Sequence, residues 1–121
     1  MAMREYMASL DAGDPAGALA RMADDLAFLI GLPSGTVTGE SKADFERYVG
    51  GRAAPPDRVH HVVRFAVDGD VELAYGIVTE SGVPTGAFMS AARVSADGRI
   101  RRYQSFFDPT FSLVDRAEVA P

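Results

Sequence analysis

The two histidines, His60 and His61, are the side chains best suited to move a proton near neutral pH. Imidazole has an unperturbed pKa of about 6.5, so it can both accept and release a proton under these conditions. The two residues are adjacent in a stretch where apolar and polar residues alternate, and adjacent side chains of a strand point to opposite faces. Only one of them can therefore face a site enclosed by the sheet.

Alternation places His60 on the same face as Val62 and Arg64, and we expect it to be the histidine that faces the site unless a β-bulge reverses the assignment. The sequence identifies no carboxylate partner for it, so two roles stay open: a general acid or base, and a hydrogen-bonded interior or interface histidine. One inward histidine without neighbouring acids is not a metal-ligand set. We expect no metal and no other cofactor.

Aromatic residues of the C-terminal half could form the walls of an apolar site. Tyr75 and Tyr103 lie in the middle of expected strands, and Phe107 shares a face with Tyr103 and Ser105. Aromatic walls suit flat apolar ligands, but buried tyrosines also serve as core residues with their hydroxyls hydrogen-bonded. Both roles stay open for the two tyrosines.

Apolar spacing predicts three helices in the N-terminal half. The first covers residues 3–10, with apolar side chains at helical intervals. Asp14 is the expected N-cap of a second, short helix that begins at Pro15. Ser41 and Asp44 resemble a capping box and predict the start of the third helix.

The strands are predicted by a change of period. A buried strand is expected over residues 26–30, and Asp24 and Asp25 before it are expected at a solvated helix end. Period-two alternation and turn signals predict four further strands, over residues 59–67, 71–80, 85–95 and 99–107. Helices followed by hairpin-linked strands indicate an α+β fold in which one antiparallel sheet curls over the helices and encloses a hollow.

The order of these segments resembles the NTF2-like superfamily, in particular its SnoaL-like and ketosteroid-isomerase-like branch. The similarity covers residues 3–111 and depends on LDAGD, MADD and GRIRRYQSFFDP in this order and spacing. It implies a cone of three helices packed in a strongly curved, mostly antiparallel sheet, with an apolar pocket and commonly a dimer. The family includes isomerases, polyketide cyclases, epoxide hydrolases, dehydratases and non-catalytic binders, so the fold alone does not decide the function.

The resemblance also implies roles for individual residues. Tyr6 corresponds to the tyrosine that donates to the substrate oxyanion in ketosteroid isomerases. Ile30 falls where those enzymes place their proton-shuttling aspartate, and Ser90 where they place a second, protonated aspartic acid. Ser105 stands where other SnoaL-like proteins have an acid. Because these side chains cannot supply the titratable group, the resemblance argues against ketosteroid-type isomerisation.

We therefore expect a SnoaL-like enzyme, of cyclase, isomerase or dehydratase type, that acts by proton transfer on an apolar carbonyl, polyketide or aromatic compound. Tyr6 would stabilise charge and His60 would move the proton. The expected binding residues are Phe28, Ile30, Tyr75, Ser90, Tyr103, Ser105 and Phe107. The alternative is a non-catalytic ligand-binding or dimerisation module that has lost the family's acids.

Composition sets the remaining expectations. With 121 residues, 47% of them hydrophobic, the chain is expected to form one domain over residues 1–121, with residues 112–121 as a C-terminal tail. A net charge of -5 disfavours nucleic acid, and no apolar run approaches the about 20 residues that cross a membrane. Without cysteine or a secretion signal, we expect a cytoplasmic location. Apolar residues on both faces of the strands predict a homodimer through the outer sheet face.

Overall fold

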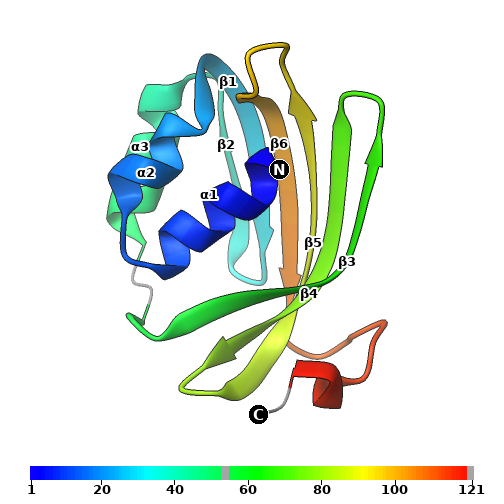
Figure 1. Cartoon of the computed structure of the whole chain (residues 1–121). Helices are drawn as coiled ribbons and strands as arrows, with labels where there is room; N and C mark the ends of the chain where they lie inside the picture. The colour runs from blue at the N-terminus through cyan, green and yellow to red at the C-terminus, as the bar shows by residue number, and fades with distance from the viewer. Residues whose placement is uncertain (53–54, 120–121) are drawn as a thin grey trace.

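Three α-helices and one six-stranded sheet make up the fold in the computed structural model, which describes residues 1–52 and 55–119 (Figure 1). The helices are α1 (Ala2–Asp11), α2 (Pro15–Ala20) and α3 (Lys42–Gly51). The strands are β1 (Met22–Leu32), β2 (Gly35–Gly39), β3 (Arg58–Asp68), β4 (Val71–Glu80), β5 (Val83–Val94) and β6 (Ile100–Asp108), followed by the 3-10 helix η1 (Arg116–Val119). The tail predicted over residues 112–121 lies partly outside the described residues.

The sheet is mixed and strongly curved. Its strand order is β2-β1-β6-β5-β4-β3, and β1 pairs with β6 in parallel while the other neighbours are antiparallel. The sheet bends around α1 without closing, and the three helices lie on its concave side (Figure 1). The predicted α+β cone with a mostly antiparallel sheet is confirmed.

Two features of the sheet differ from the sequence-based expectation. β1 begins at Met22, so Asp24 and Asp25 lie inside the strand and not at a helix end. Pairing with β6 is irregular between Met22 and Ala27, and both aspartates are exposed there. Such an irregularity lets consecutive side chains face solvent, which hides the period-two pattern. The strand β2 was missed because it is short and polar, and it lies at the edge of the sheet.

The predicted helix starts are confirmed by their caps. The side chain of Asp14 accepts a hydrogen bond from the backbone N–H of Gly17 at 3.0 Å, immediately before α2. At the start of α3, Ser41 Oγ accepts from the N–H of Asp44 at 3.1 Å. The carboxylate of Asp44 accepts in return from the N–H of Glu40 at 3.0 Å, so the capping box closes one residue earlier than usual.

A carboxylate from the sheet satisfies the N-terminus of α1. Glu72 of β4 is only 5% exposed, and its Oε1 accepts from the N–H of Met3 at 2.9 Å. The first N–H groups of a helix have no partner within the helix, and a negative charge beside them also interacts favourably with the helix dipole. Glu72 therefore fixes the start of α1 to the beginning of β4.

An aromatic cluster closes the part of the cone between α1 and α3. The ring of Tyr6 meets Tyr103 edge-on at 5.4 Å and lies 5.8 Å from Phe45, centroid to centroid. Such pairs contribute about 0.5–1.5 kcal/mol each beyond the burial of their surface. Tyr6 and Tyr103 thus stand between the packed core and the cavity described below.

Candidate functional site

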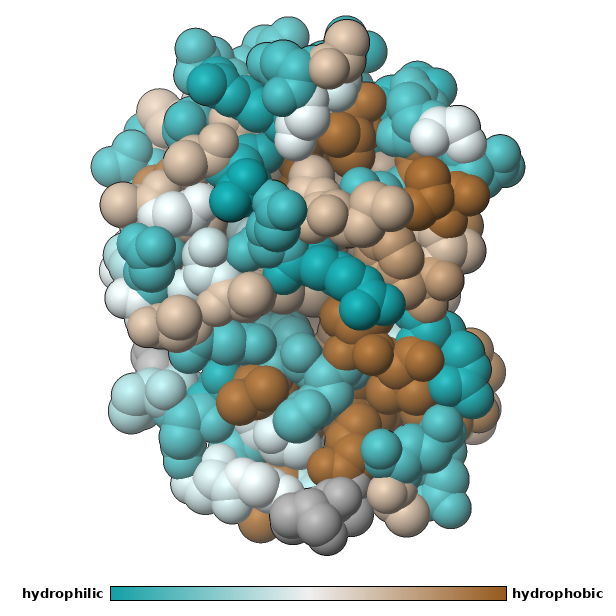
Figure 2. Space-filling view, viewed as in Figure 1, coloured by the Kyte–Doolittle hydropathy of each residue, from teal (hydrophilic) through white to brown (hydrophobic). Residues whose placement is uncertain are grey.

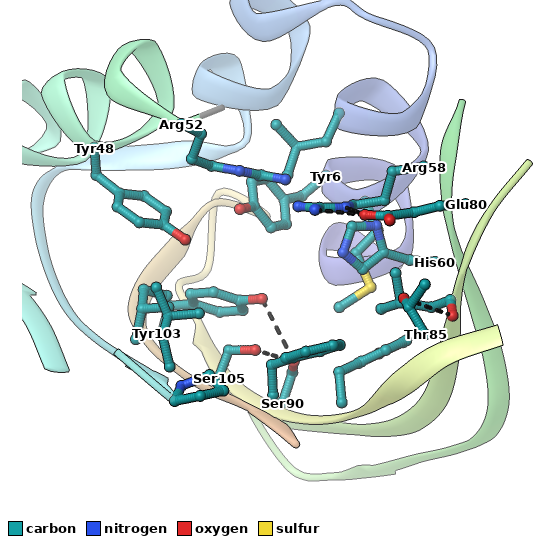
Figure 3. A pocket seen from close by; sticks show the side chains of 18 of the residues that line it. Tyr6, Tyr48, Arg52, Arg58, His60, Glu80, Thr85, Ser90, Tyr103 and Ser105 are labelled. Carbon is teal, nitrogen blue, oxygen red and sulfur yellow. Dashed lines mark hydrogen bonds and ion pairs between the residues drawn. The ribbon is translucent and has the colours of Figure 1, made fainter. Parts of the chain in front are cut away.

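A cavity of about 490 Å³ lies on the concave side of the sheet (Figure 3). Its apolar lining includes Met7, Ile30, Val78, Phe88 and Phe107, from α1 and four strands. The volume falls in the range of about 300–1,000 Å³ that is usual for small-molecule sites. Hydroxyl, imidazole and charged groups lie among these apolar side chains, so the cavity can both enclose and orient a small ligand.

His60 reaches this cavity from β3 and is held by one carboxylate. Its Nδ1 lies 2.6 Å from Asp11 Oδ1, and its backbone N–H donates to Asp11 Oδ2 at 2.8 Å. An ionised carboxylate can only accept, so Nδ1 of His60 carries the proton in this contact. In the neutral ring Nε2 is then the basic nitrogen. The ring of Phe88 meets the imidazole edge-on at 5.4 Å. The imidazole is thus oriented from two sides.

Asp11, the partner of His60, was not singled out by sequence reasoning. It is the last residue of α1 and lies 49 positions before His60 in the chain. One local signal was available: an acid in the last turn of a helix opposes the helix dipole, which suggests another role for that residue. The carboxylate partner that the sequence did not identify for His60 is therefore Asp11.

A β-bulge in β3 determines which side chains share the face of His60. The pairing of β3 with β4 shifts between Val62 and Arg64, so Arg64 turns outward while His60 and Val62 stay on the concave face. The expected common face of His60 and Arg64 was wrong. On the other face, His61 Nε2 lies 2.8 Å from the hydroxyl oxygen of Thr79. His60 is the histidine that lines the cavity, because the bulge follows it.

The hydroxyl groups of three tyrosines, Tyr6, Tyr48 and Tyr103, point toward the cavity (Figure 3). Burial raises the pKa of Tyr6 well above its ordinary value and also raises the pKa values of Tyr48 and Tyr103, against the opposing charge of Arg52. The phenols therefore remain protonated and able to donate near neutral pH. The hydroxyl of Tyr103 donates to Ser90 Oγ at 3.5 Å, a long and weak hydrogen bond.

The predicted lining residues of the sheet fall into two groups. Ile30, Ser90, Ser105 and Phe107 line the cavity together with Tyr6, His60 and Tyr103. Ser90 and Ser105 are paired across β5 and β6, and their Oγ atoms lie 2.7 Å apart. The hydroxyls form a small polar patch in the apolar surface.

Phe28 and Tyr75 do not line the cavity, and their predicted place there was wrong. Phe28 faces the helices, but α3 covers it, and its ring packs edge-on against Phe45 at 4.9 Å. Tyr75 lies on the convex face opposite Met89, where its hydroxyl accepts from the backbone N–H of Leu113 at 2.8 Å. Phe28 was misplaced because α3 packs over it. Tyr75 was misplaced because the alternation of side chains along β4 directs it to the convex face.

Charged residues that the sequence did not single out lie at the cavity. Arg58 Nε and Nη2 donate to the same oxygen, Glu80 Oε1, at 3.1 and 2.7 Å. Arg52 follows α3 and also lines the cavity. Within residues 1–52 and 55–119, no group of three or more acids and histidines could hold a metal ion. No helix in this part of the chain is long and apolar enough to cross a membrane.

Comparison with known proteins identifies the family, because residues 3–103 match the SnoaL-like domain. The chain belongs to the SnoaL-like family. No curated protein matches the sequence of this SnoaL-like protein. Its structure resembles that of a proposed ketosteroid isomerase from Kribbella flavida, with a TM-score of 0.70 and 21% identity over 95% of this chain and 86% of that chain. An LEH-like epoxide hydrolase from M. tuberculosis gives a TM-score of 0.67 and 17% identity over 88% and 80%. At these identities the similarity shows the fold alone.

The raised tyrosine pKa values predict an alkaline titration that differs between the folded and unfolded chain. Tyr6, Tyr48 and Tyr103 ionise later in the folded state than the ordinary value of 10.0. As the pH rises, the unfolded chain loses these protons before the folded chain does. The contribution of the three tyrosines to the free energy of unfolding is therefore fully present below pH 10 and falls as the pH rises through their raised pKa values. Phenolate absorbance in buffer and in urea measures both curves. Tyr103→Phe should remove one late step, and coincident curves for the two states would contradict the assignment.

Proposed function

We propose that this SnoaL-like protein is an enzyme that transfers a proton on an apolar carbonyl, polyketide or aromatic compound bound in the cavity. The observation that carries this proposal is the contact between His60 and Asp11 at the cavity wall, 2.6 Å from nitrogen to oxygen. A histidine whose second nitrogen is fixed by a carboxylate is the usual arrangement of a general base.

The arrangement supports a specific sequence of proton movements. His60 Nε2 takes a proton from the carbon beside the substrate carbonyl, and the electrons of that C–H bond move to the carbonyl oxygen as an enolate. Asp11 stabilises the imidazolium that forms, and the phenols of Tyr6 and Tyr103 donate to the enolate oxygen. Return of the proton to another carbon of the enolate completes an isomerisation. In a cyclisation the enolate carbon attacks a second carbonyl, and the alkoxide that forms takes the proton back from the imidazolium.

This proposal moves the base away from the strand on which ketosteroid isomerases carry it. Ile30, Ser90 and Ser105 leave the family's acid positions without a titratable group, which also favours the alternative of a non-catalytic binding module. The base and its carboxylate come instead from β3 and from the end of α1. The two functions differ in whether the bound compound exchanges a carbon-bound proton with solvent.

Deuterium exchange tests the enzymatic function without knowledge of the final product. Apolar cyclic and aromatic ketones are incubated with the protein in heavy water, and loss of the proton signal beside the carbonyl is followed by NMR. The wild type should accelerate exchange, and His60→Gln should lower the rate by about 10²–10⁴-fold, the usual contribution of a general base.

The neighbouring histidine supplies the matched control. His61→Gln removes an imidazole from the opposite face of β3 and should keep the wild-type exchange rate, and thermal melting checks that both variants fold. Equal rates in wild type and His60→Gln would refute the role of His60. Binding of the ketones without any exchange would support the non-catalytic module.

We further propose that two chains associate through the convex face of the sheet. Three apolar side chains of neighbouring strands are exposed on this face: Leu73 is 44%, Met89 54% and Phe106 41% exposed, and Met89 pairs directly with Phe106. Figure 2 shows further hydrophobic side chains gathered over β3 and beside the C-terminal segment. A continuous apolar surface of this kind favours association with a second copy.

A charge at the centre of this face is expected to separate the proposed dimer. Met89→Glu would place a carboxylate between Tyr75 and Phe106, so its desolvation would oppose association. Light scattering after size-exclusion chromatography should give a dimer mass for the wild type and a monomer mass for the variant. Val83→Glu alters an apolar side chain that is 62% exposed in a hairpin, and it should remain dimeric. A monomer mass for the wild type would refute the proposed dimer.

A further inference from the structure

We infer that the ligand of this cavity carries a carboxylate group, which binds to the guanidinium of Arg52. The inference rests on the proposed function in taking this cavity as the ligand site, and it deepens that function by naming a substrate class. This class consists of carboxylic acids with an apolar or aromatic body and a carbonyl group.

The position of Arg52 is set by the end of α3. Arg52 is the C-cap residue of that helix, and its backbone N–H donates to the carbonyl oxygen of Val49 at 3.3 Å. Its side chain is half-buried and lines the cavity. Figure 3 shows the guanidinium extending over the cavity close to Tyr6, on the side from which Tyr48 also points inward.

In the described part of the chain, the charged groups around the cavity leave Arg52 without a carboxylate partner. Arg58 is bound to Glu80, and the carboxylate of Asp11 is bound through both oxygens to His60. Among residues 1–52 and 55–119, no carboxylate lies within 4.0 Å of the guanidinium of Arg52. A half-buried cation facing an apolar cavity is stabilised by an opposite charge, and a bound anion would supply it.

The planar guanidinium of Arg52 can bind a carboxylate through two parallel hydrogen bonds. The guanidinium presents parallel N–H groups that match the two oxygens of a carboxylate, and the Tyr48 hydroxyl beside it offers another donor. The charge of Arg52 also acts to lower the pKa values of the three cavity tyrosines, as expected for a guanidinium near their hydroxyls. The apolar body of the acid would then lie against Phe88 and Phe107.

This geometry would also orient the reaction. A carboxylate fixed at Arg52 anchors one end of the substrate, while His60 and the Tyr103 hydroxyl line other parts of the same cavity. Anchoring at a group remote from the reacting carbon holds that carbon in place and lowers the entropic cost of proton transfer. Arg52 is thus a binding residue that determines specificity.

Paired acids and esters test the inference by calorimetric titration. The probes are naphthoate, benzoylpropionate and cyclohexylacetate, each beside its uncharged methyl ester. Wild-type protein should bind the acids at least about tenfold more tightly than the esters, as a charge-assisted pair predicts. Arg52→Gln should lose this preference. Arg101→Gln removes the same charge from an exposed position on β6 and should retain the preference.

Each remaining outcome counts for or against the inference. Equal affinity for acids and esters, no binding of any acid at millimolar concentration, or an unchanged preference in Arg52→Gln would overturn it. Arg52→Lys keeps the charge without the planar fork and should retain part of the preference, which separates charge loss from misfolding. The titrations record binding without turnover. A protein that binds the acids more tightly than the esters but shows no deuterium exchange would therefore refute the proposed catalysis and still support the carboxylate site.

Discussion

Carboxylates tie both ends of α1 to the sheet, and the cavity depends on these two contacts. At the start of the helix, Glu72 of β4 accepts from the N–H of Met3. At its end, Asp11 accepts from the backbone and contacts the ring of His60 in β3. The helix is therefore held across the concave face by polar contacts near each end, between which apolar side chains pack. The second contact also orients the imidazole, so the same carboxylate serves the fold and the proposed chemistry.

Two cavity tyrosines belong both to the packed core and to the proposed site. Tyr6 and Tyr103 bury their rings against each other and keep their hydroxyls at the cavity, where burial raises their pKa values. A phenol that resists ionisation is a donor throughout the physiological pH range, which is what an enolate oxygen requires. The apolar surroundings that stabilise the core thus also maintain the state of the groups that would stabilise charge.

Sequence reasoning succeeded where the decisive signals are local. Asp14 and Ser41 each cap a helix by accepting from a backbone N–H three residues later, and hairpin glycines mark the turns between strands. It failed where distant segments meet. The contact of Asp11 with His60 joins residues 49 positions apart, and no local pattern encodes it beyond an acid at an unfavourable helix end. Tyr75 was misplaced because alternation within one strand does not reveal which phase faces the cavity.

The proposed function requires that Asp11 holds the imidazole of His60 with Nδ1 protonated and Nε2 free to act as a base in the cavity. Nitrogen NMR of isotope-labelled histidine measures this directly, because the two ring nitrogens have distinct shifts in each tautomer. At a pH where the ring is neutral, His60 should show the Nδ1-protonated tautomer in the wild type and a mixture of tautomers in Asp11→Asn. An Nε2-protonated ring in the wild type, or the same tautomer in both proteins, would contradict it.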